Sequence, residues 1–286
     1  MQLRNTPSNV TITAVILTLN EELALPSALH SLQWCHEILV LDSGSTDSTI
    51  DVALAHRARV VTHRQPNPFN ITHQRNYALQ NCGITSDWVL FLDADETIGY
   101  ALKEEIVDTI SSDPPFDAFH LAPRYWFFGR WLRNCQSYPS WHPRLLKRGQ
   151  AYFTGGVWES FNVQARVGTL SNPYEHFSFS KGIDDWLLKH CRYADWEARS
   201  VLGYLQTNRE SSFQTRRSLF LRKLAAHLWP LRPLLRFLQK YIINRGFLDG
   251  WQGLLFCMLC FCYELVVVVK ILESFISINK SRVPDE

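Results

Sequence analysis

The feature that most constrains this chain is the apolar run Trp88–Leu92, which is followed at once by Asp93-Ala94-Asp95. A short apolar run of this length is typical of a buried strand. Open α/β sheets bind ligands just beyond the carboxyl ends of their strands, and hard divalent cations require oxygen ligands such as carboxylates. The pattern therefore predicts a site for a metal that carries phosphates. Taken alone, an Asp-x-Asp tripeptide is better explained as a solvated junction between a strand and a loop.

Two other predicted strands end in polar residues in the same way. The strand over 37–42 ends at Asp42, Gly44 then permits a tight turn, and Ser45 or Thr46 can cap the helix that follows. The first strand, 11–19, runs into Asn20-Glu21-Glu22. Three polar strand ends at one edge of a sheet favour a nucleotide-binding site over a purely structural explanation.

Strands and helices alternate regularly over the first 111 residues. The pattern predicts strands at 11–19, 37–42, 59–62 and 87–93, and helices at about 22–32, 46–57, 71–81 and 100–111. This alternation indicates an α/β fold with a mostly parallel sheet and helices on both of its faces. Residues 115–175 are aromatic and strand-like, and 182–207 is typical of a helix. We expect a catalytic domain over 1–208 and a separate helical region over 209–286.

Four motifs, in order and spacing, resemble the nucleotide-sugar half of glycosyltransferase family 2: Thr18–Glu22, Leu41–Thr49, Gln74–Asn76 and Leu92–Glu96. That family has the GT-A fold, which is Rossmann-like, and its members invert the anomeric centre. Three further segments resemble the branch that builds lipopolysaccharide cores and other envelope glycans: Gly155–Glu159, His176 and Gly246–Gly250. The resemblance implies a nucleoside diphosphate sugar as donor, with a UDP-sugar expected first, and Mg²⁺ or Mn²⁺ as the cofactor.

The resemblance also implies roles for individual residues. Asp95 is expected to bind the metal directly, Asp93 to contact it through water or to contact the ribose, and His176 to contact the metal or a phosphate. The remaining candidates would lie around the nucleotide; they are Thr18, Asn20, Glu21, Asp42, Arg75 and Asn76. Structural explanations stay open for four of these residues: a strand position for Thr18, a helix cap for Asn20, a surface ion pair for Arg75, and a hydrogen-bonded core or surface group for His176.

Glu159 is the predicted catalytic base. It follows a Gly-Gly turn and Trp158, and a carboxyl group beside an aromatic side chain can have its pKa raised toward the range of a general base. The branch that this chain resembles commonly has His before that Glu, where Trp158 stands here. Asp184 and Asp185 are the alternative bases, although an acidic pair at a helix start also stabilises the helix dipole.

The C-terminal part combines a basic stretch with an apolar one. Between Ser211 and Leu248 there are eight basic residues and no acid, interleaved with apolar and aromatic residues. Such a pattern favours an anionic membrane surface over nucleic acid as the partner. The apolar stretch 250–269 reaches the roughly 20 residues of a membrane span only by including Gln252 and Glu264. We interpret it as an interfacial or shallowly embedded helix, with a core or dimer helix as the alternative.

The cellular compartment is indicated by the cysteines and the N-terminus. The seven cysteines are scattered without metal-binding spacing, which is typical of reduced thiols. The apolar stretch 10–19 is too short and too rich in threonine for a signal peptide. We therefore expect the protein on the cytoplasmic side of the inner membrane, attached through its C-terminal region.

These features together predict a metal-dependent, inverting, hexosyltransferase-type enzyme acting on a lipopolysaccharide core or another lipid-linked envelope glycan. A polyprenyl-phosphate glycosyltransferase would share the donor half and differ in its acceptor. A sugar nucleotidyltransferase would require a Gly-rich basic loop after the first strand, where this chain is acidic. A non-catalytic membrane-binding module would not need Asp93, Asp95 and Glu159 together.

Overall fold

The computed structural model describes residues 10–65, 70–155, 159–162, 164–207 and 228–280. Its chain forms two compact units. The first unit comprises residues 1–126 and 138–180, and the second comprises 127–137 and 181–286.

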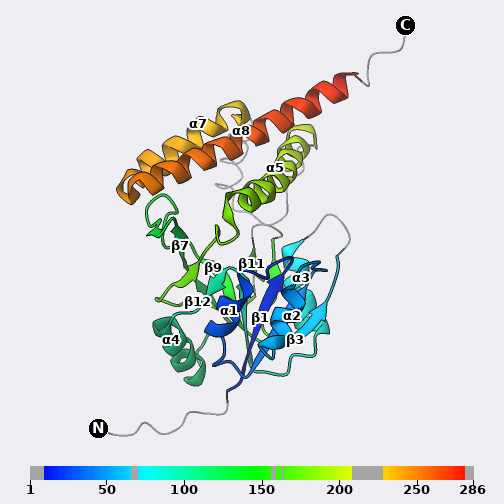
Figure 1. The fold of residues 1–286 in the computed structure, drawn as a ribbon, viewed down its shortest axis with the longest axis vertical. Helices are drawn as coiled ribbons and strands as arrows, with labels where there is room; N and C mark the ends of the chain where they lie inside the picture. The colour runs from blue at the N-terminus through cyan, green and yellow to red at the C-terminus, as the bar shows by residue number, and fades with distance from the viewer. Residues whose placement is uncertain (1–9, 66–69, 156–158, 163, 208–227, 281–286) are drawn as a thin grey trace. The chain divides into compact units, whose positions relative to one another are not determined.

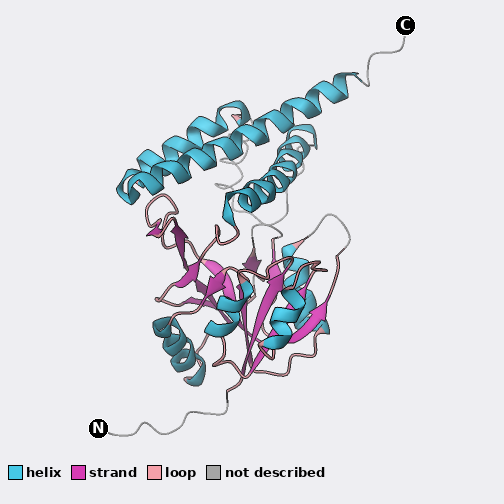
Figure 2. Cartoon of the chain, viewed as in Figure 1, coloured by secondary structure: helices cyan, strands magenta, loops and turns pink. Residues whose placement is uncertain are grey.

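A seven-stranded sheet forms the centre of the first unit, in the order β12-β6-β9-β4-β1-β2-β3 (Figures 1 and 2). Four of these strands are mutually parallel: β1 (Ile12–Thr18), β2 (Glu37–Asp42), β3 (Arg59–Thr62) and β4 (Trp88–Asp93). The sheet continues through β9 (His142–Lys147), which is antiparallel to both β4 and β6 (Ala118–Leu121), and ends with β12 (Val167–Thr169). The predicted α/β class is confirmed, and the sheet is mixed because β9 inserts between β4 and β6.

Helices cover both faces of this sheet, as predicted. Alternate residues of β1 point to opposite faces, so that Ile16 and Val15 belong to different apolar clusters. The Ile16 face is covered by α1 (Leu25–Ser31), α2 (Thr49–Ala55) and α4 (Tyr100–Ser111). The Val15 face is covered by α3 (Ile71–Asn81) and by the hairpin of β10 (Phe153–Thr154) and β11 (Ser160–Phe161). The buried strands are therefore apolar on both sides, which explains the continuous apolar runs in the sequence.

Two helices begin three residues later than the sequence predicts. The backbone N–H groups of Ala24 and Leu25 donate to the carbonyl of Glu21, so this stretch forms a turn before α1 begins. Before α2, the backbone N–H of Ser48 donates to Glu22 and that of Thr49 donates to Asp47. The predicted starts were wrong because groups of the loops take up these N–H groups: the Glu21 carbonyl before α1, and the Glu22 and Asp47 side chains before α2.

A smaller sheet brings a distant strand to the Asp-Ala-Asp segment. Within the first unit, β5 (Glu96–Thr97) is antiparallel to β13 (Tyr174–His176), which is parallel to β7 (Pro123–Phe127). In this register His176 lies opposite Glu96 on one side and opposite Tyr125 on the other. The pairing therefore places His176 next to the end of β4.

The second unit is helical. Its elements are β8 (Arg130–Trp131), α5 (Gly182–Thr207), η1 (Trp229–Leu231), α7 (Arg232–Phe237), η2 (Leu238–Ile243), η3 (Gly246–Asp249) and α8 (Gly250–Lys280). Ala194, Ala198 and Leu202 of α5 pack with Val267 and Ile271 of α8. The packing boundary thus falls at 180, whereas the predicted division at 208 follows a change in composition. The helix predicted at 182–207 belongs with the C-terminal region because its apolar stripe is buried there.

Candidate functional site

The loops that follow β1 and β2 are joined by hydrogen bonds. Asn20 Oδ1 accepts from the Thr46 N–H (2.8 Å), and Ser45 Oγ accepts from the Asn20 N–H (2.8 Å). The Glu21 N–H donates to Thr49 Oγ1 at 2.7 Å. Asn20 has a left-handed backbone (φ 56°), a conformation that asparagine tolerates better than most residues. Asn20 therefore links the two loops in this structure, in place of the helix cap considered from the sequence.

Asp42 lies fully buried beneath this pair of loops. Its Oδ1 accepts from the hydroxyls of Thr18 (3.0 Å) and Ser45, and its Oδ2 accepts from the N–H groups of Gly44 and Ser45, both at 2.8 Å. Both carboxylate oxygens are thus used within the chain. In this structure Asp42 and Thr18 shape the loop, and a contact with the nucleotide remains a prediction.

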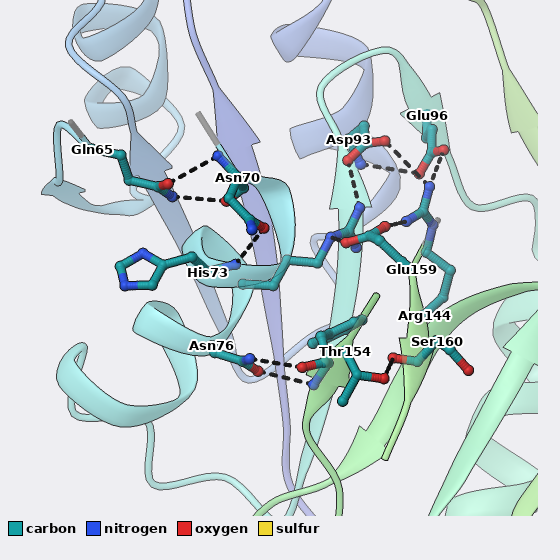
Figure 3. A network of polar contacts seen from close by, with 12 residues as sticks. Gln65, Asn70, His73, Asn76, Asp93, Glu96, Arg144, Thr154, Glu159 and Ser160 are labelled. Carbon is teal, nitrogen blue, oxygen red and sulfur yellow. Dashed lines mark hydrogen bonds and ion pairs between the residues drawn. The ribbon is translucent and has the colours of Figure 1, made fainter. Parts of the chain in front are cut away.

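At the end of β4, the partly exposed carboxylate of Asp93 joins a network of charges that includes two buried arginines (Figure 3). Asp93 Oδ1 is 3.0 Å from Arg75 Nη2, and Asp93 Oδ2 is 3.2 Å from Arg144 Nη2. Both guanidinium groups are almost completely buried. Burial alone would raise the pKa of Asp93, but Arg144 and Arg75 outweigh it and hold that pKa below its usual range. Asp93 is therefore ionised at neutral pH.

Glu159 contacts the same two arginines from the opposite side. Its Oε1 is 2.8 Å from Arg75 Nε, and its Oε2 is 3.9 Å from Arg144 Nη1. Its side chain is 12% exposed, and burial raises the pKa of its carboxyl group despite the two arginines. This direction matches what a general base requires. Gly156, Val157 and Trp158, which the sequence places just before it, lie outside the described residues.

Glu96 and His176 complete the network. Glu96 is fully buried, its Oε1 lies 2.6 Å from Arg144 Nη2, and its Oε2 accepts from the Asp93 N–H at 3.0 Å. His176 lies between two acids, with Nε2 3.4 Å from Asp95 Oδ2 and Nδ1 3.4 Å from Glu96 Oε1. Burial opposes a charge on this imidazole, but Asp95 and Glu96 outweigh burial and raise its pKa.

The donor set fits a divalent cation that also binds phosphate. The cluster holds four carboxyl groups, Asp93, Asp95, Glu96 and Glu159, against two guanidinium groups, Arg75 and Arg144, and the imidazole of His176, so acidic groups outnumber basic ones. Neighbouring ligands of an octahedral Mg²⁺ lie about 3 Å apart, close to the 3.4 Å between Asp95 Oδ2 and His176 Nε2. No group of three or more His, Cys, Asp or Glu side chains arranged for a metal occurs in the part of the chain that the structure describes. A cation held by one or two protein groups and completed by phosphate oxygens is usual for Mg²⁺.

Comparison with known proteins identifies the family. The model of glycosyl transferase family 2 matches residues 13–165, which contain both joined loops and every member of the charged network except His176. The chain belongs to glycosyltransferase family 2. It is therefore a glycosyltransferase that uses a nucleotide-sugar donor.

Two relatives cover much of this glycosyltransferase. One is the lipopolysaccharide core biosynthesis glycosyltransferase LpsC of Rhizobium meliloti, 28% identical over 65% of this chain and 70% of that protein. An uncharacterized glycosyltransferase of Rickettsia felis is 34% identical over 93% of this chain and 90% of its own length. Among solved structures, glucosyl-3-phosphoglycerate synthase from Mycobacterium tuberculosis, bound to Mn²⁺, UDP and glucosyl-3-phosphoglycerate, is 29% identical. That match covers 41% of this chain and 45% of the other, with a TM-score of 0.35, which does not transfer its ligands to this chain.

Arg75 and Asn76 of this glycosyltransferase have different surroundings from those that the sequence suggested. Arg75 is 1% exposed and lies over the rings of Phe91 and Phe153, so the surface ion pair considered for it was wrong. Asn76 donates to the carbonyl of Phe153 and accepts from its N–H, both at 2.9 Å. In this structure the Asn76 amide fixes the backbone of β10 at Phe153.

Sequence reasoning missed the roles of Arg144 and Glu96. Arg144 is followed by Leu145-Leu146 in a buried strand, and a charge in such a strand requires an opposite charge nearby. That signal could have indicated Arg144, but the identity of its partners depends on how β9 pairs with β4. Asp184 and Asp185, the alternative bases, lie in the first turn of α5 in the second unit, where Asp185 is 3.6 Å from Lys181 Nζ.

The role of Asn76 leads to a prediction about stability. Asn76→Ala removes two hydrogen bonds to the Phe153 backbone and leaves that N–H and C=O without their partner. We expect a loss of about 1–3 kcal/mol in the free energy of unfolding. Asn81→Ala is the matched control because Asn81 is an exposed asparagine on the same helix. Urea denaturation of both variants measures the difference, and equal stability would contradict the role assigned to Asn76.

Proposed function

We propose that this protein is an inverting, metal-dependent glycosyltransferase. It moves a sugar from a nucleoside diphosphate sugar, with a UDP-sugar expected first, to a lipopolysaccharide core or another lipid-linked envelope glycan. The observation that carries the proposal is the pair of arginines that hold Asp93 and Glu159 together. They link Asp93, at the carboxyl end of β4 where the donor is expected to bind, to Glu159, a buried carboxyl group suited to act as a base. The name of the LpsC relative supports the class of acceptor.

Glu159 acts as the base in this proposal. Its carboxylate accepts the proton of the acceptor hydroxyl while the hydroxyl oxygen forms a bond to the anomeric carbon. The bond from that carbon to the diphosphate breaks on the opposite side, which inverts the configuration. Burial favours this step because a carboxyl group with a raised pKa is a stronger proton acceptor.

Asp95 and His176 would hold the divalent cation, and Asp93 would contact it through water or contact the ribose. Bound there, Mg²⁺ or Mn²⁺ would neutralise the charge that develops on the diphosphate leaving group. The joined loops after β1 and β2 form the rest of the donor edge. On this proposal the nucleoside lies against them, with Asn20 and Glu21 nearest to it and with Thr18 and Asp42 supporting the loop.

Attachment to the membrane is proposed for the second unit. Gly246–Ile276 is the one stretch in the described helices that is long and apolar enough to cross a membrane, and 33% of its most apolar part is buried in the protein. One of its three acids, Glu264, is buried between Arg232 (2.8 Å) and Arg236 (3.0 Å) of α7. Large apolar side chains of both helices are exposed instead, among them Leu234, Leu235, Leu254 and Met258. A buried, paired acid surrounded by exposed apolar side chains is an arrangement expected for helices in contact with lipid.

The ion pairs of Arg232 and Arg236 with Glu264 change which force is expected to hold the protein at the membrane. The sequence suggests that the basic stretch is held by anionic lipid head groups. Two of its four described basic residues, however, pair with Glu264, Arg232 pairs with Glu197 as well, and a third, Lys240, contacts the Cys135 carbonyl at 3.1 Å. Arg216, Arg217, Arg222 and Lys223 lie outside the described residues. We therefore propose apolar burial as the main source of membrane affinity.

The metal assignment predicts how donor binding responds to EDTA. Asp95→Asn should weaken Mn²⁺-dependent binding of UDP by more than about 100-fold, since loss of even an indirect metal contact costs 10–100-fold. Asp93→Asn should weaken the same Mn²⁺-dependent binding of UDP by about 10-fold. Asp108→Asn, an exposed acid on α4, is the control. Calorimetry with and without EDTA gives the affinities, and UDP binding that EDTA leaves unchanged would refute the metal site.

Removal of the proposed base should affect turnover more than donor binding. Glu159→Gln is expected to bind UDP with Mn²⁺ normally and to lose roughly 10²–10⁴ in turnover. Glu175→Gln is the control because Glu175 also pairs with an arginine in a partly buried position, at 3.1 Å from Arg124. Donor-hydrolysis and transfer assays measure kcat. Weakened UDP binding with unchanged turnover would exclude Glu159 as the base.

Vesicle flotation tests the apolar contact with lipid. Replacing Leu234, Leu235, Leu254 and Met258 with Gln should release most of the protein from vesicles of mixed neutral and anionic lipids, at low and at high salt, because apolar burial is not screened by ions. Leu54→Gln, an exposed leucine on α2, should have no effect. If 0.5 M salt alone releases the unaltered protein, charge and not apolar burial dominates the attachment.

A further inference from the structure

We propose that Arg144 is a positioning residue that sets the place of the base relative to the donor site. The inference rests on the proposed function, since it takes Glu159 as the base and Asp93 as a donor-site acid. Arg144 would not touch the reacting atoms. It would act through Glu159, by holding that carboxylate in register with the end of β4.

Asp93, Glu159 and the two arginines form a closed ring of charges. Asp93 accepts hydrogen bonds from Arg75 through Oδ1 and from Arg144 through Oδ2, whereas Glu159 forms ion pairs, with Oε1 2.8 Å from Arg75 Nε and Oε2 3.9 Å from Arg144 Nη1. The two carboxylates are therefore linked through the same pair of guanidinium groups. The ring therefore converts a displacement at the donor acid into a displacement at the base.

Arg144 differs from Arg75 by one further contact. Arg144 alone of the two also contacts Glu96, with its Nη2 at 2.6 Å from Glu96 Oε1 and 3.2 Å from Asp93 Oδ2. Glu96 in turn accepts from the Asp93 N–H and lies 3.4 Å from His176 Nδ1. One guanidinium therefore contacts the base, the donor acid and the carboxylate beside the proposed metal ligand. Arg75, held over the rings of Phe91 and Phe153, contacts only the first two.

Arg144 is held at both its backbone and its guanidinium group. It lies on β9, and its neighbour Leu145 is paired with Leu90 of β4 and with Phe119 of β6. Its guanidinium lies 5.4 Å from the centre of the buried Tyr174 ring. A side chain fixed at both ends in this way suits a positioning role. A lysine at this position would keep one charge but could not form the planar fork that reaches three carboxylates.

The test is a double-mutant cycle on the full chain. The variants are Arg144→Lys, Glu159→Gln and the two combined, with UDP affinity in Mn²⁺, kcat and KM measured for each. Arg144→Lys should lower kcat by about 10–100-fold, the usual cost of losing a supporting contact, with less than a threefold change in UDP affinity. In the Glu159→Gln background, Arg144→Lys should lower kcat by less than threefold, because the residue through which Arg144 acts is already disabled.

Two further variants separate positioning from folding. Arg59→Lys is the matched control, because Arg59 forms a 2.6 Å ion pair with Glu37 at the other end of the sheet strands, and it should keep full activity. If Arg144→Lys does not fold, Arg144→Gln combined with Glu96→Gln removes the buried charge together with its partner, and it is compared with Glu96→Gln alone in the same cycle.

The outcomes distinguish this inference from the proposed function. If Arg144→Lys lowers kcat by the same factor in the wild-type and Glu159→Gln backgrounds, the two residues act independently. That result would overturn this inference and leave the proposed function standing. Wild-type kcat in Arg144→Lys would also overturn it, since charge without the fork would then suffice. A fully active Glu159→Gln variant would refute the assignment of the base, and the inference with it.

Discussion

The burial of two guanidinium groups among carboxylates is the constraint on which the site depends. Arg75 and Arg144 are almost completely buried, and a buried charge persists only when it is paired and hydrogen bonded. Asp93, Glu96 and Glu159 supply that pairing from three different parts of the chain. Because none of these groups can lose its partners without a large loss of stability, the network holds β4, β9, α3 and Glu159 in one arrangement.

Strand pairing determines what this network can bind. The antiparallel register of β5 with β13 places His176 opposite Glu96, so an imidazole far away in sequence lies 3.4 Å from Asp95. Four carboxyl groups face two guanidinium groups and one imidazole, and this excess of acidic groups suits a divalent cation. A phosphate-bearing donor would bring further negative charge, and the cation would balance both.

The second unit reverses the usual distribution of polarity. Glu264 is buried with Arg232 and Arg236, while leucine, isoleucine and tryptophan side chains of α7, η2 and α8 are exposed. Reading the basic stretch as a set of free positive charges overlooked this pairing, because Glu264 lies beyond the stretch, on the following helix. A count of charges along a sequence does not show which of them neutralise one another.

The sequence by itself determined the α/β class, the helices at 71–81, 100–111 and 182–207, and the membership of glycosyltransferase family 2. Each of these follows from local periodicity or from short motifs within about 90 residues, which the chain order preserves. It also indicated Asp93, Asp95, Glu159 and His176 as candidates, whose roles are still predictions. Only the tertiary structure decided that Asn76 is used by the Phe153 backbone, that Asp42 is enclosed by its own loop, and that Arg144 and Glu96 join the donor acid to the proposed base. The physical reason is that a buried side chain takes its partners from strand register and helix packing, which bring together residues tens of positions apart. No local pattern records those distances.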